Sequence, residues 1–200
     1  MGRIGAAAAI VLSAACAGCH WTGGGFRADG PEMPRLREAL ALQAGRVVAD
    51  VGAGKGELTF ALAKEAKHVF STELDPDRLR RLREAKLANV TVVQASGNET
   101  GLPPECCDAI VLRRVYHHLS DPAAINASLL RALRPGGVLA VVDFPPPLFF
   151  SRGDFGVPAQ DVVAEVTKSG FQLVRVMDDW PGRGPLASYC VVFRKPRDGR

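Results

Sequence analysis

The stretch that decides the fold is residues 47–66, VVADVGAGKGELTFALAKEA, in a chain of 200 residues. Small and apolar residues lead into Asp50, and glycines then stand at every second position, Gly52, Gly54 and Gly56. Apolar residues recur at helical spacing from position 58 to position 66. The pattern predicts a strand, a tight glycine turn and a helix. Because glycine has no Cβ, a ligand can lie against such a turn, where the helix N-terminus offers N–H groups.

The spacing of these glycines argues against two phosphate-binding loops. A dinucleotide loop reads G-x-G-x-x-G. Here the third glycine comes one residue early, and Glu57 stands where that loop needs glycine, so its carboxylate would face a pyrophosphate. A P-loop reads G-x-x-x-x-G-K-[ST]. In this chain Gly54-Lys55 is followed by Gly56, and Ala49 takes the place of the earlier glycine.

Residues 50–56, DVGAGKG, instead resemble motif I of the class I S-adenosylmethionine-dependent methyltransferases. The ligand of that family carries an ammonium and no phosphate, which suits an acidic neighbour. The resemblance, which extends over residues 36–195, implies a Rossmann-like α/β sandwich of three layers. Its seven-stranded sheet is mostly parallel, with an antiparallel last strand. It also implies S-adenosylmethionine as the cofactor, bound by residues of the loop: Asp50, Gly52, Ala53, Gly54 and Gly56.

Two further segments complete the predicted donor site. A second strand over residues 68–73 ends in Glu73, about twenty residues after the loop opens, where a Rossmann sheet faces ribose hydroxyls. Leu74 follows it and is a further candidate. A third strand over residues 90–94 leads to Ser96 and Gly97, where the family usually has Gly-Asp before its adenine contacts. The alternatives are an exposed strand-end charge at Glu73 and a simple polar turn at Ser96.

The fourth strand, residues 108–112, runs into RRVYHHL at residues 113–119. Ligands of parallel sheets bind at the carboxyl ends of the strands, so this segment should face the donor and the acceptor. We expect Arg113 to contact the donor. Tyr116, His117 and His118, together with Asp143 after the fifth strand, are the catalytic candidates, since such groups orient an acceptor or take its proton. The alternative is a structural histidine.

Proline and glycine residues indicate where the remaining helices and strands begin and end. Helices are predicted at residues 34–42, from Asp75-Pro76 with Leu79, Leu82 and Leu87 buried, from Asp121-Pro122, and at residues 158–169. Residues 134–137, RPGG, predict a turn before a strand at 138–142. Residues 144–150 contain three prolines and predict a loop or lid. Strands at 171–177 and 188–194 enclose a loop at 178–182.

The N-terminus has the pattern of a targeting segment. Arg3 precedes an apolar run at residues 4–15, which is too short to span a bilayer and fits a signal-peptide core. Small residues lead into Cys16 and Cys19, and both sites resemble lipoprotein processing sites, with Cys19 preferred. We therefore expect a leader at 1–19, a flexible linker at 20–31, the methyltransferase domain at 32–196 and a basic tail at 197–200. The alternative is an alanine-rich leader on a cytoplasmic protein.

The cysteines are not expected to bind metal or haem. Cys16, Cys19 and His20 spell the c-type haem motif C-x-x-C-H, but they abut the apolar run, and no separate haem domain follows. No second Cys or His pair is placed to complete a zinc site. Cys106 and Cys107 fall in the turn before the fourth strand, and we expect no catalytic role for them.

Composition sets the limits of function. The net charge is +4, and residues 194–200 at the C-terminal end carry +3 of it, which argues against a broad nucleic-acid-binding surface. The expected activity is methyl transfer to an unidentified acceptor, a small molecule, by in-line displacement. The alternatives are a non-catalytic ligand-binding protein of the same fold and an NAD-dependent oxidoreductase, which Glu57 disfavours. The leader implies a lipid-anchored protein of the bacterial envelope, although the methyl donor is made in the cytoplasm.

Overall fold

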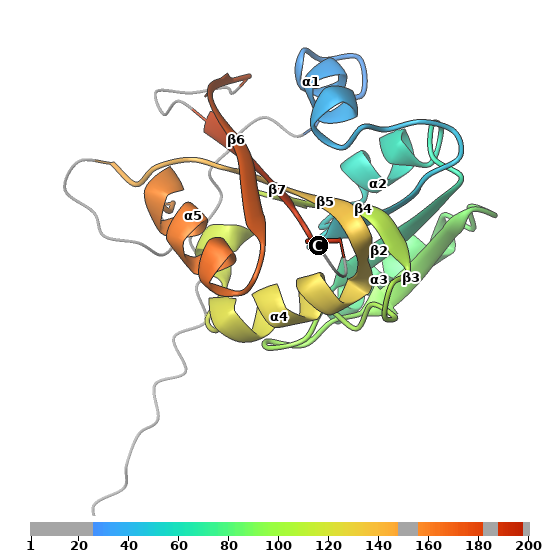
Figure 1. Ribbon diagram of the computed structural model, residues 1–200. Helices are drawn as coiled ribbons and strands as arrows, with labels where there is room; N and C mark the ends of the chain where they lie inside the picture. Colours follow the sequence, from blue (N-terminus) through green and yellow to red (C-terminus); the bar gives the residue numbers. More distant parts are fainter. Residues whose placement is uncertain (1–25, 148–155, 182–187, 198–200) are drawn as a thin grey trace, which may run out of the picture.

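Seven strands form one sheet in the order β3-β2-β1-β4-β5-β7-β6 (Figure 1). The computed structural model describes residues 26–147, 156–181 and 188–197. The strands are β1 Val47–Val51, β2 His68–Glu73, β3 Val90–Gln94, β4 Cys107–Arg113, β5 Leu133–Asp143, β6 Gln172–Trp180 and β7 Ser188–Arg194. The helices are α1 Glu32–Ala39, α2 Glu57–Leu62, α3 Pro76–Glu84, α4 Pro122–Ala132 and α5 Ala159–Lys168, with the 3-10 turn η1 Tyr116–His118.

Strand direction confirms the predicted fold class. The pairs β1–β2, β1–β4, β2–β3 and β4–β5 are all parallel, whereas β7 runs antiparallel to both β5 and β6. The sheet is therefore the predicted seven-stranded, mostly parallel one with an antiparallel last strand. The carboxyl ends of β1 to β5 consequently meet at one edge of the sheet, which we call the carboxyl edge, and their beginnings form the opposite amino edge.

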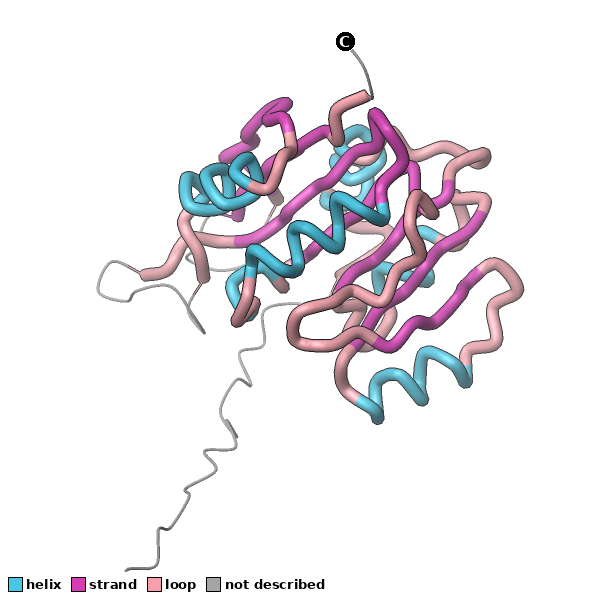
Figure 2. Tube along the Cα trace, turned by 60° about the horizontal axis from the view of Figure 1, so that its bottom comes forward, coloured by secondary structure: helices cyan, strands magenta, loops and turns pink. Residues whose placement is uncertain are grey.

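Helices cover both faces of the sheet and make a three-layer sandwich (Figure 2). Successive side chains of β4 point to opposite faces, so Ala109 and Val111 join one core while Ile110 and Leu112 join the other. The first core is closed by α1 and α2, and the second by α4 and α5. Because a strand buried on both faces reads as a continuous apolar run, residues 109–112 gave a clear strand signal.

The helix starts are fixed by local chemistry. Asp75 accepts hydrogen bonds from the backbone N–H groups of Asp77 and Arg78, both at 2.9 Å, and Pro76 takes the first helical position. Asp121 caps α4 in the same way through the Ala124 N–H at 3.0 Å. These predictions are confirmed. The predicted burial of Leu87 is wrong, because α3 ends at Glu84 and Leu87 is 39% exposed beyond it.

The predicted turn at residues 134–137 is instead the first part of β5. Leu133 pairs with Cys107, and the next pair is Val138 with Ala109, so β5 bulges by several residues. The bulged residues form hydrogen bonds with a segment that is distant in the sequence. The Gly136 N–H donates to the Lys195 carbonyl at 3.0 Å, and the Lys195 N–H donates to the Gly137 carbonyl at 2.9 Å.

Two other boundaries differ for long-range reasons. The predicted loop at 178–182 begins later, because β6 continues to Trp180, whose indole N–H donates to Glu32 at 3.0 Å. The helix predicted at 34–42 is α1, which begins at Glu32 and ends at Ala39. Residues 144–147 of the predicted lid form no strand. Phe26, predicted to be linker, is 7% exposed and packs in the core.

Several predictions lie outside the described residues. They are the leader at 1–19 with Cys16, Cys19 and His20, the first part of the linker, residues 148–150 of the lid, and residues 198–200 of the tail. Within the described ranges no helix is long and apolar enough to cross a membrane. Those ranges also contain no cluster of His, Cys, Asp and Glu that would hold a metal ion.

Candidate active site

The three glycines of the loop have different surroundings. A Cβ on Gly52, where φ is +74°, would lie 2.6 Å from the Val115 side chain, and one on Gly56 would lie 2.7 Å from Leu82 and Phe60. These two glycines are required by packing. Gly54 has φ +58°, yet a Cβ there would meet nothing within 4 Å. The loop is closed against the protein on both sides of Gly54 and open above it.

Glu73 is held beside this opening by the backbone. Its Oε2 accepts from the Gly54 N–H at 2.7 Å, and its Oε1 accepts from the N–H groups of Leu74 at 2.7 Å and Asp75 at 3.1 Å. The side chain is buried although it is charged. A carboxylate that accepts from three N–H donors can still accept from a hydroxyl group, because its two oxygens offer about four lone-pair sites.

Exposed residues lie next to Glu73, one of them apolar after β2 and two of them small after β3. Leu74 is 55% exposed, which is unusual for a residue that follows a buried strand. Glu73 pairs in register with Gln94, so the exposed Ser96 and Gly97 lie next along the same edge. The Ser96 hydroxyl donates to the Asn98 side chain at 3.0 Å, so its hydrogen is used within the turn.

A buried His–Asp pair lies at the ends of β4 and β5. The Nδ1 of His117 is 2.8 Å from Asp143 Oδ1, and the His117 N–H donates to Oδ2 at 3.2 Å. Asp143 is fully buried and His117 is 6% exposed. The His117 ring packs against the exposed His118, with centroids 3.9 Å apart, and against Phe144 at 4.9 Å. The structure thus brings together three of the four predicted catalytic residues.

Comparisons with known proteins agree with this geometry. Residues 49–141 match the family model described as a methyltransferase domain. The chain covers 89% of a SAM-dependent methyltransferase from Aquifex aeolicus, which covers 82% of this chain, with a TM-score of 0.70 at 21% identity. The chain has the fold of a class I methyltransferase.

Curated relatives are similar over part of their length. An uncharacterized methyltransferase of Mycobacterium tuberculosis is 32% identical over 114 residues, which are 56% of this chain and 57% of that protein. A ubiquinone/menaquinone biosynthesis C-methyltransferase of Vibrio vulnificus is 31% identical over 113 residues, 52% of this chain and 44% of that protein. The chain therefore spans about half the length of the curated relatives it matches.

Asp50 of this methyltransferase fold lies below the glycine loop. It is 2% exposed, and its Oδ2 accepts from the Thr59 hydroxyl at 2.6 Å, which ties α2 to β1. Burial raises the pKa of Asp50 to about 6, although the Thr59 hydrogen bond and the Arg113 charge oppose that rise. The structure thus turns this predicted donor ligand toward the interior.

Arg113, a predicted donor contact, lies at the end of β4 and is bound to a side chain of α1. Its Nε and Nη2 donate to the two carboxylate oxygens of Glu32, each at 2.8 Å, and its guanidinium lies 5.3 Å from the centre of the Phe26 ring. Glu32 accepts from Trp180 as well. Arg113 therefore joins α1, β4 and the end of β6, and its donors are occupied by protein.

Tyr116 is enclosed in the core between α4 and α5. It is fully buried, and its hydroxyl donates to Glu165 at 3.1 Å and accepts from the Asn126 side chain at 2.9 Å. The hydroxyl of this predicted catalytic residue is therefore engaged by two protein side chains. The three adjacent residues thus have different surroundings: Tyr116 lies in the core, His117 is paired with Asp143, and His118 is exposed. The sequence alone does not predict this difference.

Sequence reasoning missed Arg114. Its backbone has φ +58°, and its N–H donates to the Val142 carbonyl at 2.7 Å. The side chain is half-buried, and within the described part of the chain its buried Nε has no hydrogen-bond partner. The one available signal was the pair of arginines at the end of a strand.

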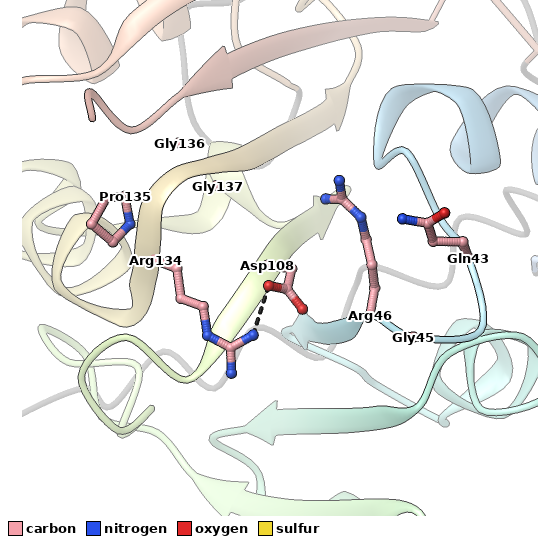
Figure 3. Close-up of a pocket in the computed structure, with 8 residues that line it drawn as sticks. All are labelled: Gln43, Gly45, Arg46, Asp108, Arg134, Pro135, Gly136 and Gly137. Carbon is pink, nitrogen blue, oxygen red and sulfur yellow. Dashed lines mark hydrogen bonds and ion pairs between the residues drawn. The ribbon is translucent and has the colours of Figure 1, made fainter. Parts of the chain in front are cut away.

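A pocket of about 380 Å³ lies at the amino edge, opposite the predicted site. Figure 3 shows the Asp108 carboxylate between Arg46 and Arg134 there. Asp108 accepts from Arg134 at 2.6 Å and from the Val47 N–H at 2.8 Å. None of the predicted donor or catalytic residues lines this pocket.

Proposed function

We propose that this chain is an S-adenosylmethionine-dependent methyltransferase acting on a small molecule. The observation that carries the proposal is the Glu73 carboxylate, fixed at the carboxyl end of β2 beside the open side of Gly54. A fixed carboxylate suits the vicinal hydroxyls of a ribose. It does not suit a phosphate, and Glu57 at the start of α2 adds a second negative charge.

The residues fit the cofactor in three respects. Gly54 leaves room for a ligand against the backbone, Glu73 offers acceptors for ribose hydroxyls, and Leu74 offers an exposed apolar surface to a purine. Ser96 and Gly97 border the purine end, while Gly52, Ala53 and Gly56 shape the loop. When bound, S-adenosylmethionine supplies an electrophilic methyl group on a sulfonium. The chain's own task is to position the reactants, because in-line displacement needs no protein nucleophile.

The His117–Asp143 pair supports a role in taking a proton from the acceptor. With its hydrogen on Nδ1 facing Asp143, the imidazole keeps an unprotonated Nε2 that acts as a base. Asp143 accepts in addition from the Phe144 N–H at 3.0 Å, so its orientation is fixed. An acceptor with an acidic O–H or N–H group would use this pair, and the exposed His118 lies beside it.

Calorimetry with S-adenosylhomocysteine tests the proposal. We expect saturable binding to the folded domain, and weaker or no binding of NAD. Tighter binding of NAD than of S-adenosylhomocysteine would overturn it in favour of an oxidoreductase.

A second candidate is a ligand-binding protein without catalytic activity, since one fold hosts many functions. It is favoured by the engagement of Tyr116 and Arg113 in structural contacts. Methyl transfer from radiolabelled S-adenosylmethionine to a metabolite extract distinguishes the two. Label incorporation that Glu73→Ala abolishes supports the enzyme, whereas donor binding without incorporation supports the binder.

We also propose that the leader sends the chain to the bacterial envelope, with Cys19 as the lipidated residue. Support comes from Arg3, the apolar run at 4–15 and the glycine-rich segment after Cys19. Fractionation with mass spectrometry of the mature N-terminus tests it. A cytoplasmic protein that retains Met1 or Gly2 would refute it, and would remove the question of how an exported enzyme obtains its donor.

A further inference from the structure

Arg114 combines a left-handed backbone with a buried, unpartnered donor on its side chain. Its φ of +58° lies in the left-handed region, which a long side chain adopts only at an energetic disadvantage and which is concentrated at functional sites. Its Nε is buried and has no hydrogen-bond partner among the residues that the structure describes. Within the described ranges no hydrogen bond or ion pair reaches its guanidinium. A half-buried charge left unpaired in this way is unfavourable for the folded protein alone.

The neighbouring Arg113 has a guanidinium whose hydrogen-bond donors have partners. Its Nε and one Nη donate side by side to the two oxygens of Glu32. This side-on fork is the arrangement in which arginine matches a carboxylate. Arg114 has the same donor pair, and its Nε has no partner among the described residues, so a carboxylate is the kind of group that would satisfy it.

The protein's own nearby carboxylates are already engaged. Glu32 accepts from Arg113 and Trp180, and Asp143 accepts from His117 and Phe144. Burial lowers the pKa of Arg114 and the charge of Arg113 lowers it further, whereas Glu32 and Asp143 raise it. Those two carboxylates therefore stabilise the charge of Arg114 from a distance and leave its hydrogen-bond donors available.

The backbone of Arg114 lies at the carboxyl edge, where the proposed site is. It follows β4 directly, and its neighbour Val115 lies against Gly52 of the glycine loop. If β3 receives the purine and Glu73 of β2 the ribose, the amino-acid end of the donor extends past β1 toward β4. The backbone of Arg114 is bonded to β5, on the side where His117 and Asp143 lie.

We propose that Arg114 is the carboxylate-binding residue of the site, forming a side-on fork with its ligand. The inference rests on the proposed function. Two ligands carry such a group: the donor, through its methionyl carboxylate, and an acceptor that is itself a carboxylic acid. In either case Arg114 fixes the ligand's anionic end, and the strained backbone places its fork at the junction of β4 and β5.

The direct test is the NMR signal of the Arg114 Nε–Hε group, assigned by its loss in Arg114→Lys. S-adenosylhomocysteine, 5′-methylthioadenosine, which lacks the amino-acid end, and acetate are the probes. A shift with S-adenosylhomocysteine but not with methylthioadenosine identifies the donor carboxylate. No shift with S-adenosylhomocysteine, followed by a shift when acetate is added to that complex, identifies the acceptor side. No shift with either carboxylate overturns the proposal.

Arg114→Asn keeps the backbone conformation, because asparagine tolerates positive φ, and removes the fork. If the donor is the source, this variant should bind S-adenosylhomocysteine about tenfold or more weakly and methylthioadenosine unchanged. Arg114→Lys should retain part of the affinity, since it keeps the charge without the fork. Arg83→Asn on the exposed face of α3 is the matched control and should change neither affinity.

Two separate measurements distinguish failure of the proposed function from failure of the Arg114 proposal. If calorimetry detects no binding of S-adenosylhomocysteine or methylthioadenosine, the methyltransferase proposal fails. The acetate titration of the ligand-free protein then decides the Arg114 proposal alone. A shift of its Nε–Hε signal supports a carboxylate site without the donor, and an unchanged signal refutes it.

Discussion

The two edges of the sheet both carry charged residues, but these charges are satisfied in different ways. At the amino edge Asp108, Arg134 and the Val47 N–H satisfy one another around a pocket of about 380 Å³. At the carboxyl edge Glu73 is held by backbone N–H groups beside the open side of Gly54, and Arg114 has a buried donor without a partner among the described residues. The proposed donor site thus lies at the edge where polar contacts are incomplete, and the pocket lies at the edge where they are complete.

The two edges also differ in the pKa of a buried or half-buried aspartate: the pKa of Asp50 is raised and the pKa of Asp108 is lowered. Burial raises the pKa of Asp50 near the carboxyl edge. At the amino edge partial burial alone raises the pKa of Asp108, but hydrogen bonds from Val47 and Arg134, with the charges of Arg134 and Arg46, lower it overall. Ionised Asp50 therefore destabilises the fold, whereas ionised Asp108 stabilises it. Charge variants at the two edges should accordingly have opposite signs.

The largest expected effect belongs to Asp50→Asn. The pKa of Asp50 rises from 3.8 to about 6 on folding, so the folded state holds the proton more tightly, and stability falls as pH increases through that window. The difference of about two pH units corresponds to about 3 kcal/mol. Urea unfolding at pH 4 and pH 7 should show this loss in the wild type and not in Asp50→Asn. Equal pH dependence of the two proteins would contradict it.

Glu73→Ala should weaken donor binding by tenfold or more, because a charge-assisted hydrogen bond contributes about 1.5–3 kcal/mol. Calorimetry with S-adenosylhomocysteine measures it. Glu73→Gln keeps the shape and should lose less, while circular dichroism verifies the fold of both. If the affinity is unchanged, Glu73 only fixes the loop.

Asp108→Asn should lower the free energy of unfolding at pH 7 by about 1 kcal/mol, a value reduced by partial solvent exposure. Since the pKa of Asp108 is lowered in the folded state, its stabilisation is present above pH 3.8 and is lost as pH falls below that value. The gap to the wild type should therefore close on acidification. Donor affinity should stay constant, and a loss of affinity would move the functional site toward the amino edge.

The smallest effect is expected from the combined variant Cys106→Ser and Cys107→Ala. Cys107 is fully buried, so alanine replaces it without burying a new hydroxyl. The hydrogen bond that the Cys107 S–H donates to Cys106, together with burial, raises the pKa of Cys107, which therefore remains a thiol and is no nucleophile. Donor affinity should change less than about twofold, as for substitutions remote from a site. A larger loss would give these thiols a role at the site.

Sequence predicted what local chemistry fixes. The glycine spacing, the position of Glu73 and the helix caps at Asp75 and Asp121 all depend on residues close in the chain, and each lies where it was predicted. The donor-site role of Glu73 itself stays a prediction. The fold class followed from the family resemblance that the glycine motif carries.

What sequence could not supply depends on distant partners. Arg113 and Arg114 are adjacent and chemically equal, yet only Arg113 meets Glu32, a residue of α1 that lies far away in sequence. Tyr116 is buried because α5 brings Glu165 to its hydroxyl. Likewise, Gly136 and Gly137 belong to β5, and not to the predicted turn, because the C-terminal segment at Lys195 pairs with them. In each case the deciding contact is tertiary.

The anchorage of Trp180 gives the protein an optical reporter. The indole is 4% exposed, donates to Glu32, and lies 5.6 Å from the Arg35 guanidinium across its face. Indole emission responds to the electric field of nearby charges, and Glu32 links this ring directly to Arg113, the neighbour of Arg114. The sequence has only one other tryptophan, Trp21. In a Trp21→Phe protein Trp180 would be the one remaining indole, and its emission wavelength would follow the contacts of Glu32 with Arg113 and Trp180 as ligands enter the carboxyl edge.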